Sequence, residues 1–501
     1  MKRCLVLLPL LLTFGCGNDD SATPAPAENA PSTEALTYYK DVKAIIDARC
    51  ANCHRPGDIG PFSLTTYEEV MAFKVPVQAS IANGTMPPWQ PDDACNTYAG
   101  NIDITDDEKA DLMAWLEGES LEGDPADAPE AVAAPAPYET DIVVKLPEPY
   151  TPVLEPDDYR CQLIPWPADE KRFVTGLRVK PDQRAIVHHV IVFLIGPDQV
   201  EEFMAYDAAE EGPGYTCYGG PQGGGAGGFD NVDPARLLAA LETLGLSLAD
   251  VRSGNLTAAQ LSALIEELGG GGTMGTAGFS TIGSWVPGNP ERPLPAGTGI
   301  PVEPGSMMVV QMHYNTLSSA PVADQSSIEI ATAPAVEREA TNLAMVDLGW
   351  ISNGLIGEPM TIPAGESKVE HSTLLTYDSF LVDRARQALG LPEGAPLVIH
   401  SANHHMHGLG RSQRTEIRHA DGSNTCVLDI PDWDFNWQGS YALEDSVTLR
   451  PGDALWMGCS WDNSAANQPI IDGEVRAPAD VSWGEGTTDE MCLGGLYVTG
   501  E

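Results

Sequence analysis

The chain has 501 residues, of which 43% are hydrophobic, so it can bury several cores distributed over two to four domains. Asp and Glu (72 residues) far outnumber Lys and Arg (27 residues), and the formal net charge is −45. This charge excludes nucleic acid as a partner, because no basic surface is available to replace the counterions of the phosphates. It is typical of an exported protein that negative charge keeps soluble, with docking to a positively charged redox partner as the alternative.

The N-terminal residues read as an export signal. Lys2 and Arg3 precede an apolar run that is too short to span a bilayer, and the run ends at Gly15 and Cys16. We expect a lipoprotein-type signal peptide over 1–16, with Cys16 lipidated. Thr13 stands where such signals usually have leucine, so ordinary cleavage is the alternative. In either case we expect an exported protein at the periplasmic or outer surface of a bacterial membrane, attached by a lipid anchor alone.

A Pro/Ala/Ser-rich tether is expected over 17–35, and a compact all-α unit over 36–118. The sequence of this unit contains Cys50-Ala-Asn-Cys53-His54, in which two thiols two residues apart can bond to a haem and the adjacent histidine can reach its iron. We therefore predict one covalently bound haem c with Cys50, Cys53 and His54 as its attachment and axial residues.

Helical patterns flank this motif. An apolar face leads into it over 37–50, and Thr105 with Glu108 predicts the capped start of a second helix, so that the unit resembles a class I cytochrome c. Met86 is the expected sixth iron ligand, because the two prolines after it stiffen its loop. Met71 and Met113 lie in helical patterns and are expected in the core. A haem with both axial positions filled transfers electrons.

An acidic Pro/Ala linker is expected over 119–138, and short β-type runs separated by Pro, Gly, Asp and Asn follow it. This pattern predicts two all-β, jelly-roll-like sandwiches over 139–320 and 321–501. A helical insertion over 230–268 is expected in the first sandwich, where Thr257 and Gln260 form a capping box. The whole chain is thus expected to be multidomain, with one small all-α unit followed by two β-sandwiches.

Three histidines occur in apolar strands of the first sandwich. His188 and His189 are neighbours, so on a flat strand they would point to opposite faces, and they can share a metal only if the strand is twisted or bulged or if they bind through different ring nitrogens. His313 lies in another apolar strand, and three imidazoles suit Cu or Zn. A buried structural histidine beside an exposed one is the alternative.

The stretch SANHHMHGLGR contains the second candidate site. His405 and His407 are two residues apart and therefore project from one face of a strand, whereas His404 and Met406 point the other way. A shifted register, with His404 in place of His405, is the alternative. Met491 is the candidate third ligand, and its thioether favours Cu(I); ordinary core packing is the alternative for this residue.

The segments VHH, QMHY, HMH and DEMC, in this order, resemble the copper type II, ascorbate-dependent monooxygenases, over roughly 140–501 without the helical insertion. The resemblance implies an electron-supplying copper at His188, His189 and His313. It also implies an oxygen-binding, catalytic copper at His405, His407 and Met491.

The resemblance further implies two disulfides, Cys161–Cys217 in the first sandwich and Cys459–Cys492 in the second. Cys95 and Cys426 are left over, and we hypothesise that they pair between the haem and copper parts.

The activity that the resemblance implies is hydroxylation of a C–H bond with O2, using two copper ions. The peptide-amidating members have an arginine and a tyrosine where this chain has Asn403 and Gly495, which argues against a peptide substrate. We expect an unknown small organic substrate and an external electron donor, with electrons passing through the fused haem in place of ascorbate. The alternatives are an exported electron-transfer protein without oxygenase activity and a copper-dependent reductase or peroxidase.

Overall fold

The computed structural model describes most of the chain beyond the first 34 residues. The described residues are 35–51, 53–56, 60–130, 138–217, 220–221, 234–252, 256–268, 279–286, 292–316, 319–352, 354–355, 357–435, 437–471, 474–484, 486 and 488–501. The expected signal peptide, the lipidation site Cys16 and all of the tether except residue 35 lie outside them. No helix in the described ranges is both long and apolar enough to cross a membrane.

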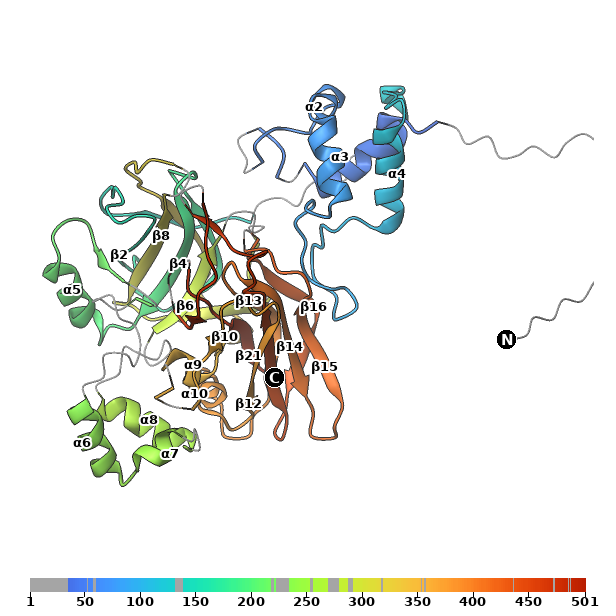
Figure 1. Cartoon of the computed structure of the whole chain (residues 1–501). Helices are drawn as coiled ribbons and strands as arrows, with labels where there is room; N and C mark the ends of the chain where they lie inside the picture. Colours follow the sequence, from blue (N-terminus) through green and yellow to red (C-terminus); the bar gives the residue numbers. More distant parts are fainter. Residues whose placement is uncertain are drawn as a thin grey trace, which may run out of the picture.

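The N-terminal part is helical and stands at one corner of the molecule (Figure 1). Its elements are η1 (Tyr38–Val42), α1 (Lys43–Arg49), α2 (Tyr67–Ala72), α3 (Lys74–Ala82), α4 (Asp106–Glu117) and the short η2 (Pro125–Asp127). Thr105 caps α4 in a capping box with Glu108, as expected. Tyr38, Leu112 and Trp115 are buried in the core of this part, and Met71 and Met113 pack against that core.

The chain after α4 returns to the helices instead of leaving them at once. The backbone N–H groups of Tyr38 and Tyr39 donate to the carbonyl oxygens of Leu121 and Glu122. Ser120 is buried, and its hydroxyl donates to the carbonyl of Trp115. Residues 119–122 therefore belong with the helical part, although the sequence pattern assigned them to the linker.

The rest of the described chain is mostly β-structure. A five-stranded sheet has the order β5-β2-β8-β4-β6, with β2 (Asp157–Pro165), β4 (Val187–Ile195), β5 (Tyr215–Thr216), β6 (Phe279–Trp285) and β8 (Met307–Asn315). An eight-stranded sheet has the order β1-β9-β3-β7-β10-β21-β13-β16, with β1 (Ile142–Lys145), β3 (Arg172–Lys180), β7 (Thr298–Val302), β9 (Ser327–Ala333), β10 (Arg338–Met345), β13 (Leu397–His405), β16 (Ser440–Leu449) and β21 (Leu493–Gly500). A four-stranded sheet has the order β12-β17-β14-β15, with β12 (Val369–Thr376), β14 (Gly410–Arg418), β15 (Asn424–Ile430) and β17 (Ala454–Trp461). Two small sheets pair β11 (Thr361–Ile362) with β20 (Val481–Ser482) and β18 (Ile470–Ile471) with β19 (Glu474–Val475).

The first sandwich packs the five-stranded sheet against β1, β9, β3 and β7. Val190 and Val310 of the five-stranded sheet share one buried cluster with Val174 and Ile330 of the other. The alternation of inward apolar residues on both sheets produces this core. Helix α5 (Val200–Ala209) lies beside the five-stranded sheet and buries Phe203.

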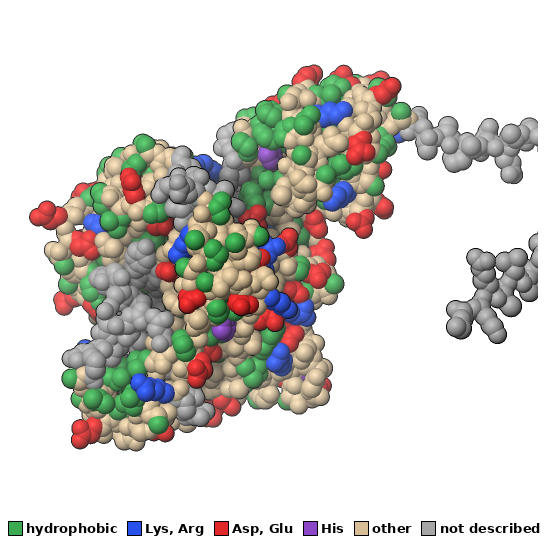
Figure 2. All heavy atoms as spheres, viewed as in Figure 1, with side chains coloured by type: hydrophobic (Ala, Val, Ile, Leu, Met, Phe, Trp, Pro, Cys, Tyr) green, Lys and Arg blue, Asp and Glu red, His purple; other side chains and the backbone are tan. Residues whose placement is uncertain are grey.

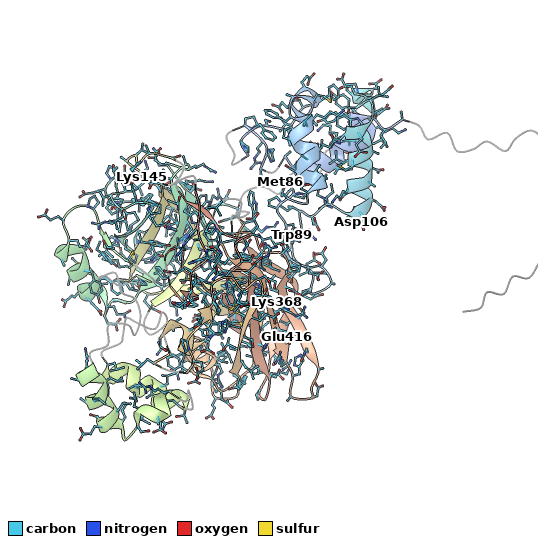
Figure 3. The ribbon with its side chains drawn as sticks, viewed as in Figure 1. Met86, Trp89, Asp106, Lys145, Lys368 and Glu416 are labelled. Atoms are coloured by element: carbon cyan, nitrogen blue, oxygen red, sulfur yellow. A yellow bond between two sulfur atoms is a disulfide. The ribbon has the colours of Figure 1, made fainter. Side chains whose placement is uncertain are left out.

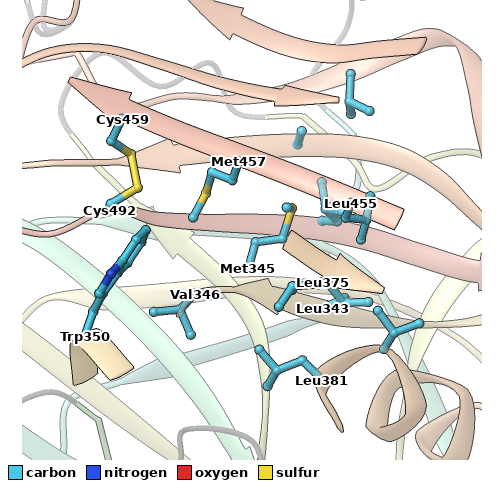
Figure 4. Close-up of a cluster of buried hydrophobic side chains, with 14 of the residues drawn as sticks. Leu343, Met345, Val346, Trp350, Leu375, Leu381, Leu455, Met457, Cys459 and Cys492 are labelled. Carbon is cyan, nitrogen blue, oxygen red and sulfur yellow. A yellow bond between two sulfur atoms is a disulfide. The ribbon is translucent and has the colours of Figure 1, made fainter. Parts of the chain in front are cut away.

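The second sandwich packs the four-stranded sheet against β10, β21, β13 and β16. Figure 4 shows Leu455 and Met457 from β17 beside Leu343 and Met345 from β10, and all four belong to one buried cluster. Two helices, α9 (Leu348–Ile351) and α10 (Phe380–Ala388), complete this part of the chain.

The two sandwiches are joined by a shared sheet. β10 pairs in parallel with β7, with Arg338 opposite Thr298 and Glu339 opposite Gly299. Strand β9, which lies after residue 320, pairs with β1 and β3 of the first sandwich. By strand pairing, the change from one sandwich to the other therefore falls between β9 and β10, whereas the sequence pattern placed the division at 320/321.

The inserted helices are α6 (Pro234–Leu244), α7 (Leu248–Arg252) and α8 (Ala258–Glu267). They follow β5 of the first sandwich in sequence, but α8 contacts α10 and its Leu261 and Leu264 share the core cluster of the second sandwich. The insertion therefore packs against the second sandwich (Figure 1). Residues 230–233, with which the expected insertion begins, lie outside the described part.

The helical part is docked on the second sandwich. Residues 97–99 run antiparallel to the edge strand β16, where the Ala99 N–H donates to the Ala442 carbonyl (2.8 Å) and the Glu444 N–H donates to the Thr97 carbonyl (3.0 Å). A disulfide joins Cys95 to Cys426 in β15. These contacts cover the exposed edge of the eight-stranded sheet.

Figure 2 shows acidic side chains spread over the visible face of both parts.

Candidate metal centres

The first candidate centre is formed by β4 and β8. His189 lies opposite His313 in this antiparallel pair, and the register shifts between Val187 and His189. The irregularity falls on His188 and allows two successive side chains to turn to one side. The ligand atoms of His188, His189 and His313 all lie within 4.8 Å of one another.

The three imidazoles meet through their Nδ1 atoms. The Nδ1 of His189 lies 3.4 Å from that of His188 and 3.2 Å from that of His313. The Nε2 of His313 donates to Oδ1 of Asp157 (2.8 Å), which leaves its Nδ1 available for a metal. The Tyr159 ring stacks on His313 at a centroid distance of 4.0 Å. The site is thus a convergent set of nitrogen donors with a carboxylate that sets the tautomer of one of them.

Burial keeps these imidazoles neutral. Burial and the nearby His313 lower the pKa of His188 to about 4. Burial, and then the neighbouring histidines, lower the pKa of His189, and burial lowers the pKa of His313 against the opposing effect of Asp157. Neutral imidazole is the form that binds a metal ion, so a metal here competes with no proton near neutral pH.

Asp157 provides a test of the first centre. The Asp157→Ala variant is expected to lower the copper affinity of the three-histidine site by about 10- to 100-fold, because the carboxylate that orients His313 is lost. Titration of the copper-free protein, followed by EPR, measures the effect. The second centre of the same molecule is the internal control, and equal weakening of both centres would contradict the assignment.

The second candidate centre lies at the end of β13. The rings of His405 and His407 are 5.1 Å apart between centroids. Nδ1 of His405 contacts Oε1 of Gln438 (2.5 Å), and Nδ1 of His407 contacts the carbonyl of Asp489 (3.0 Å). Both contacts occupy Nδ1, so each imidazole retains Nε2 for a metal. Burial lowers the pKa of His407 to about 3.

His404 lies apart from this pair. Its Nε2 contacts the Thr415 hydroxyl at 2.9 Å, and its side chain is buried. Met406 is fully buried in the core of the second sandwich. His404 and Met406 therefore have different partners from His405 and His407, although His404 lines the same cavity as that pair.

Met491 lies two residues before Leu493, which is the β21 partner of His405. Its side chain is 4% exposed and, with His405 and His407, it lines one cavity. The disulfide Cys459–Cys492 ties the next residue to β17 (Figure 4). The predicted residues of the second centre thus lie at adjacent ends of two paired strands, with His405 as the last residue of β13, His407 just after it and Met491 just before β21, and a disulfide fastens this end to β17 of the opposite sheet.

Glu490 supports this centre and was missed by the sequence analysis. Its fully buried carboxylate accepts hydrogen bonds from the N–H groups of His407 (2.9 Å), Leu409 (2.6 Å) and Met491 (3.3 Å) and from the indole of Trp461 (2.9 Å). Burial raises the pKa of Glu490 to about 7, against the effect of these donors. The sequence signal that could have indicated Glu490 is an acidic residue directly before an apolar strand, because such a residue is seldom buried without partners.

The two centres face one cavity of about 810 Å³ between the sandwiches. His189 from the first centre lines it together with the three residues of the second. The Phe435 ring lies between the centres, with its centroid 5.2 Å from that of His188 and 5.9 Å from that of His407. One aromatic side chain therefore contacts a histidine of each centre.

Two residues at this cavity stand where the peptide-amidating enzymes have an arginine and a tyrosine. Asn403 and Gly495 are direct partners in the β13–β21 pair. A Cβ atom at position 495 would collide with Oδ1 of Asn403, so the amide fills the space that a larger residue would use.

In the first sandwich, Cys161 of β2 is bonded to Cys217, as the resemblance implied. The cysteines of the predicted haem motif form no disulfide in the structure and are half-buried. The three disulfides among the described residues are those of a protein that folds in an oxidising compartment.

His54, the predicted axial ligand, has one ring nitrogen in a hydrogen bond. Its Nδ1 donates to the Phe62 carbonyl (3.0 Å), which leaves Nε2 for an iron. Phe62 stacks on Phe73 at 4.0 Å beside it. Met86 follows α3 at the edge of the helical part that faces the sandwiches (Figure 3). These donors and the apolar rings fit a haem, and the structure brings Cys50, Cys53 and His54 to the end of α1.

Comparison with known proteins identifies the second sandwich. Residues 349–498 match the copper type II ascorbate-dependent monooxygenase C-terminal domain. The chain is also 24% identical over 218 residues to MOXD1 homolog 1 of Drosophila melanogaster, a match that covers 42% of this chain and 27% of the fly protein. The chain therefore spans about a quarter of that relative. The family match contains His405, His407 and Met491 and leaves the helical part outside.

Proposed function

We propose that this protein is an exported copper-dependent monooxygenase that hydroxylates a C–H bond of a small organic molecule. The proposal starts from the second sandwich, which matches the C-terminal domain of the copper monooxygenases. One observation carries the proposal: His189 of the three-histidine cluster and the residues His405, His407 and Met491 line one cavity. The reaction consumes the substrate, O2, two electrons and two protons, and it yields the alcohol and water.

Some of these residues would hold copper, and others orient the residues that hold it. Copper held by His188, His189 and His313 and by His405, His407 and Met491 would supply one-electron redox chemistry and O2 activation. Asp157 holds the tautomer of His313, and Gln438 holds the ring of His405 through Nδ1. Glu490 fixes the backbone of His407 and Met491 relative to each other, because one carboxylate binds both N–H groups. This arrangement orients three donors and leaves room for a small molecule, as a catalytic metal site requires.

The cavity favours a neutral substrate. Three arginines line it and each has a partner: Arg178 pairs with Glu329 (3.1 Å), Arg292 donates to the carbonyls of Ala99 and Gly100, and Arg384 is also engaged in an interaction. Asn403 stands where the peptide-amidating enzymes have an arginine. We therefore propose a neutral, partly apolar organic substrate without a carboxylate.

A covalent haem c on Cys50, Cys53, His54 and Met86 is the proposed electron source, in a class I cytochrome c-like unit. The hydrogen bond that leaves Nε2 of His54 available and the two thiols that form no disulfide support it. An external donor would reduce this haem, and lipidation of Cys16 would hold the protein at a membrane surface.

The decisive experiment is product analysis with isotopically heavy O2. Copper-loaded protein is supplied with ascorbate and a panel of neutral organic molecules, and O2 uptake and product mass are measured. We expect substrate-dependent uptake and one heavy oxygen atom in the product. Uptake without incorporation, or no uptake by protein that holds both copper ions, would favour the electron-transfer protein.

A further inference from the structure

The segment that joins Met86 to the docked residues 97–99 lies along the second sandwich. Besides the Cys95–Cys426 disulfide, the Asp92 N–H donates to the Asp429 carbonyl (2.9 Å). Tyr98 is 2% exposed, and its hydroxyl donates to the Val427 carbonyl (3.2 Å). Figure 3 shows Met86 and Trp89 between the helices and the β-sheets. The expected sixth haem ligand is thus three residues from a segment that is fixed to the copper-binding half of the protein.

Aromatic rings fill this junction. The Trp89 ring lies 5.3 Å from Tyr441 and 6.4 Å from Tyr98, and the rings of Tyr98 and Tyr441 are 6.0 Å apart. All of these rings pack against the core of the second sandwich. These edge-to-face ring contacts help to fasten the segment to the second sandwich.

A hydrogen bond continues from this segment to the metal centres. Nε2 of Gln90 donates to the carbonyl of Asp434 (2.9 Å), and the next residue is Phe435, whose ring stacks on His188. The connection from Met86 to His188 therefore consists of the backbone over 86–90, one hydrogen bond, one peptide unit and one ring contact. Each of its steps is thus a covalent link, a hydrogen bond or a ring contact.

We infer that residues 86–90 and the loop at 434–435 form the electron entry route from the haem to the three-histidine copper, with Gln90 and Phe435 as its positioning residues. This inference rests on the proposed function, because it takes the haem as the donor. In each transfer one electron leaves the haem iron, which goes from Fe(II) to Fe(III), and the copper goes from Cu(II) to Cu(I). The Phe435 ring lies closer to His188 of the electron-supplying centre (5.2 Å) than to His407 of the proposed oxygen site (5.9 Å), so we place the end of the route at the electron-supplying centre.

The test measures the transfer directly in the full chain loaded with haem and copper. Anaerobic rapid mixing with one electron equivalent of a fast reductant is followed by the absorbance of ferrous haem and by the EPR signal of Cu(II). Gln90→Leu should slow haem reoxidation by at least about tenfold, because it removes only the hydrogen bond to Asp434. Phe435→Leu should slow it similarly, whereas Phe435→Tyr keeps the ring and should keep the rate.

Trp456→Leu is the matched control for loss of a ring, since Trp456 packs under Arg418 in the four-stranded sheet, and it should leave the rate unchanged. Ascorbate-driven turnover should be unchanged in Gln90→Leu, which separates electron entry from catalysis. Equal rates in the wild type, Gln90→Leu and Phe435→Leu would overturn the route. A haem that never passes its electron to copper, in protein that ascorbate still activates, would overturn the route and leave the monooxygenase standing. Protein that is inactive with both donors would refute the proposed function itself.

Discussion

Replacing Met491 by leucine should abolish substrate-dependent O2 consumption, with a loss of at least about 100-fold, while copper at the three-histidine centre stays bound. Leucine has nearly the volume of methionine, so the core should lose less than about 1.5 kcal/mol. The thioether sulfur, which favours Cu(I), is lost completely. O2 uptake together with copper analysis measures both effects.

Met406→Leu is the matched control. Met406 stands between His405 and His407 in sequence but is buried in the core on the other side of the strand. The same substitution there should leave activity within about twofold of the wild type, since volume-conserving swaps are well tolerated. If Met491→Leu keeps its activity, or if both variants lose it equally, Met491 is a core residue and not a ligand.

Glu490→Ala should produce the largest loss of stability among single substitutions at the centres. The change leaves four buried N–H donors without an acceptor, and each such donor costs about 1–3 kcal/mol. Partial rehydration offsets part of this cost, so we expect the free energy of unfolding to fall by about 3–5 kcal/mol. Copper binding at the second centre should weaken as well, because His407 and Met491 lose their common anchor.

Denaturant unfolding of the copper-free protein measures the first effect and copper titration the second. Glu416→Ala is the control: Glu416 is also buried in the second sandwich, but it pairs with the half-exposed Arg414 and Arg418, so its loss should cost about 1 kcal/mol. A Glu490→Ala protein no less stable than Glu416→Ala would show that the four hydrogen bonds contribute little.

Local spacing predicted much of the candidate chemistry. His405 and His407 share a face because side chains alternate along a strand, and Thr105 with Glu108 caps α4 because the two side chains lie within one turn. For His188 and His189 the same alternation required a twist, a bulge or binding through different ring nitrogens, and the register shift against β8 provides a bulge.

Residues that act through distant partners were not predictable in this way. Glu490, Gln438 and Phe435 have no motif of their own, and each contacts a histidine 33 to 247 residues away in sequence. The pairing of Cys95 with Cys426 was hypothesised only because the other cysteines had been assigned, and it spans 331 residues.

The sequence alone thus predicted the candidate ligand types and their order, since covalent spacing and strand period set which side chains lie on one face. It also indicated an α-helical unit ahead of a β-rich remainder. Only the tertiary structure decided that β9 stays with the first sandwich, that one sheet runs through both, and that residues 92–99 are docked on β15 and β16 of the second sandwich. Those arrangements depend on which apolar faces and strand edges meet, and such long-range contacts are selected by the burial of the whole chain and not by any local pattern.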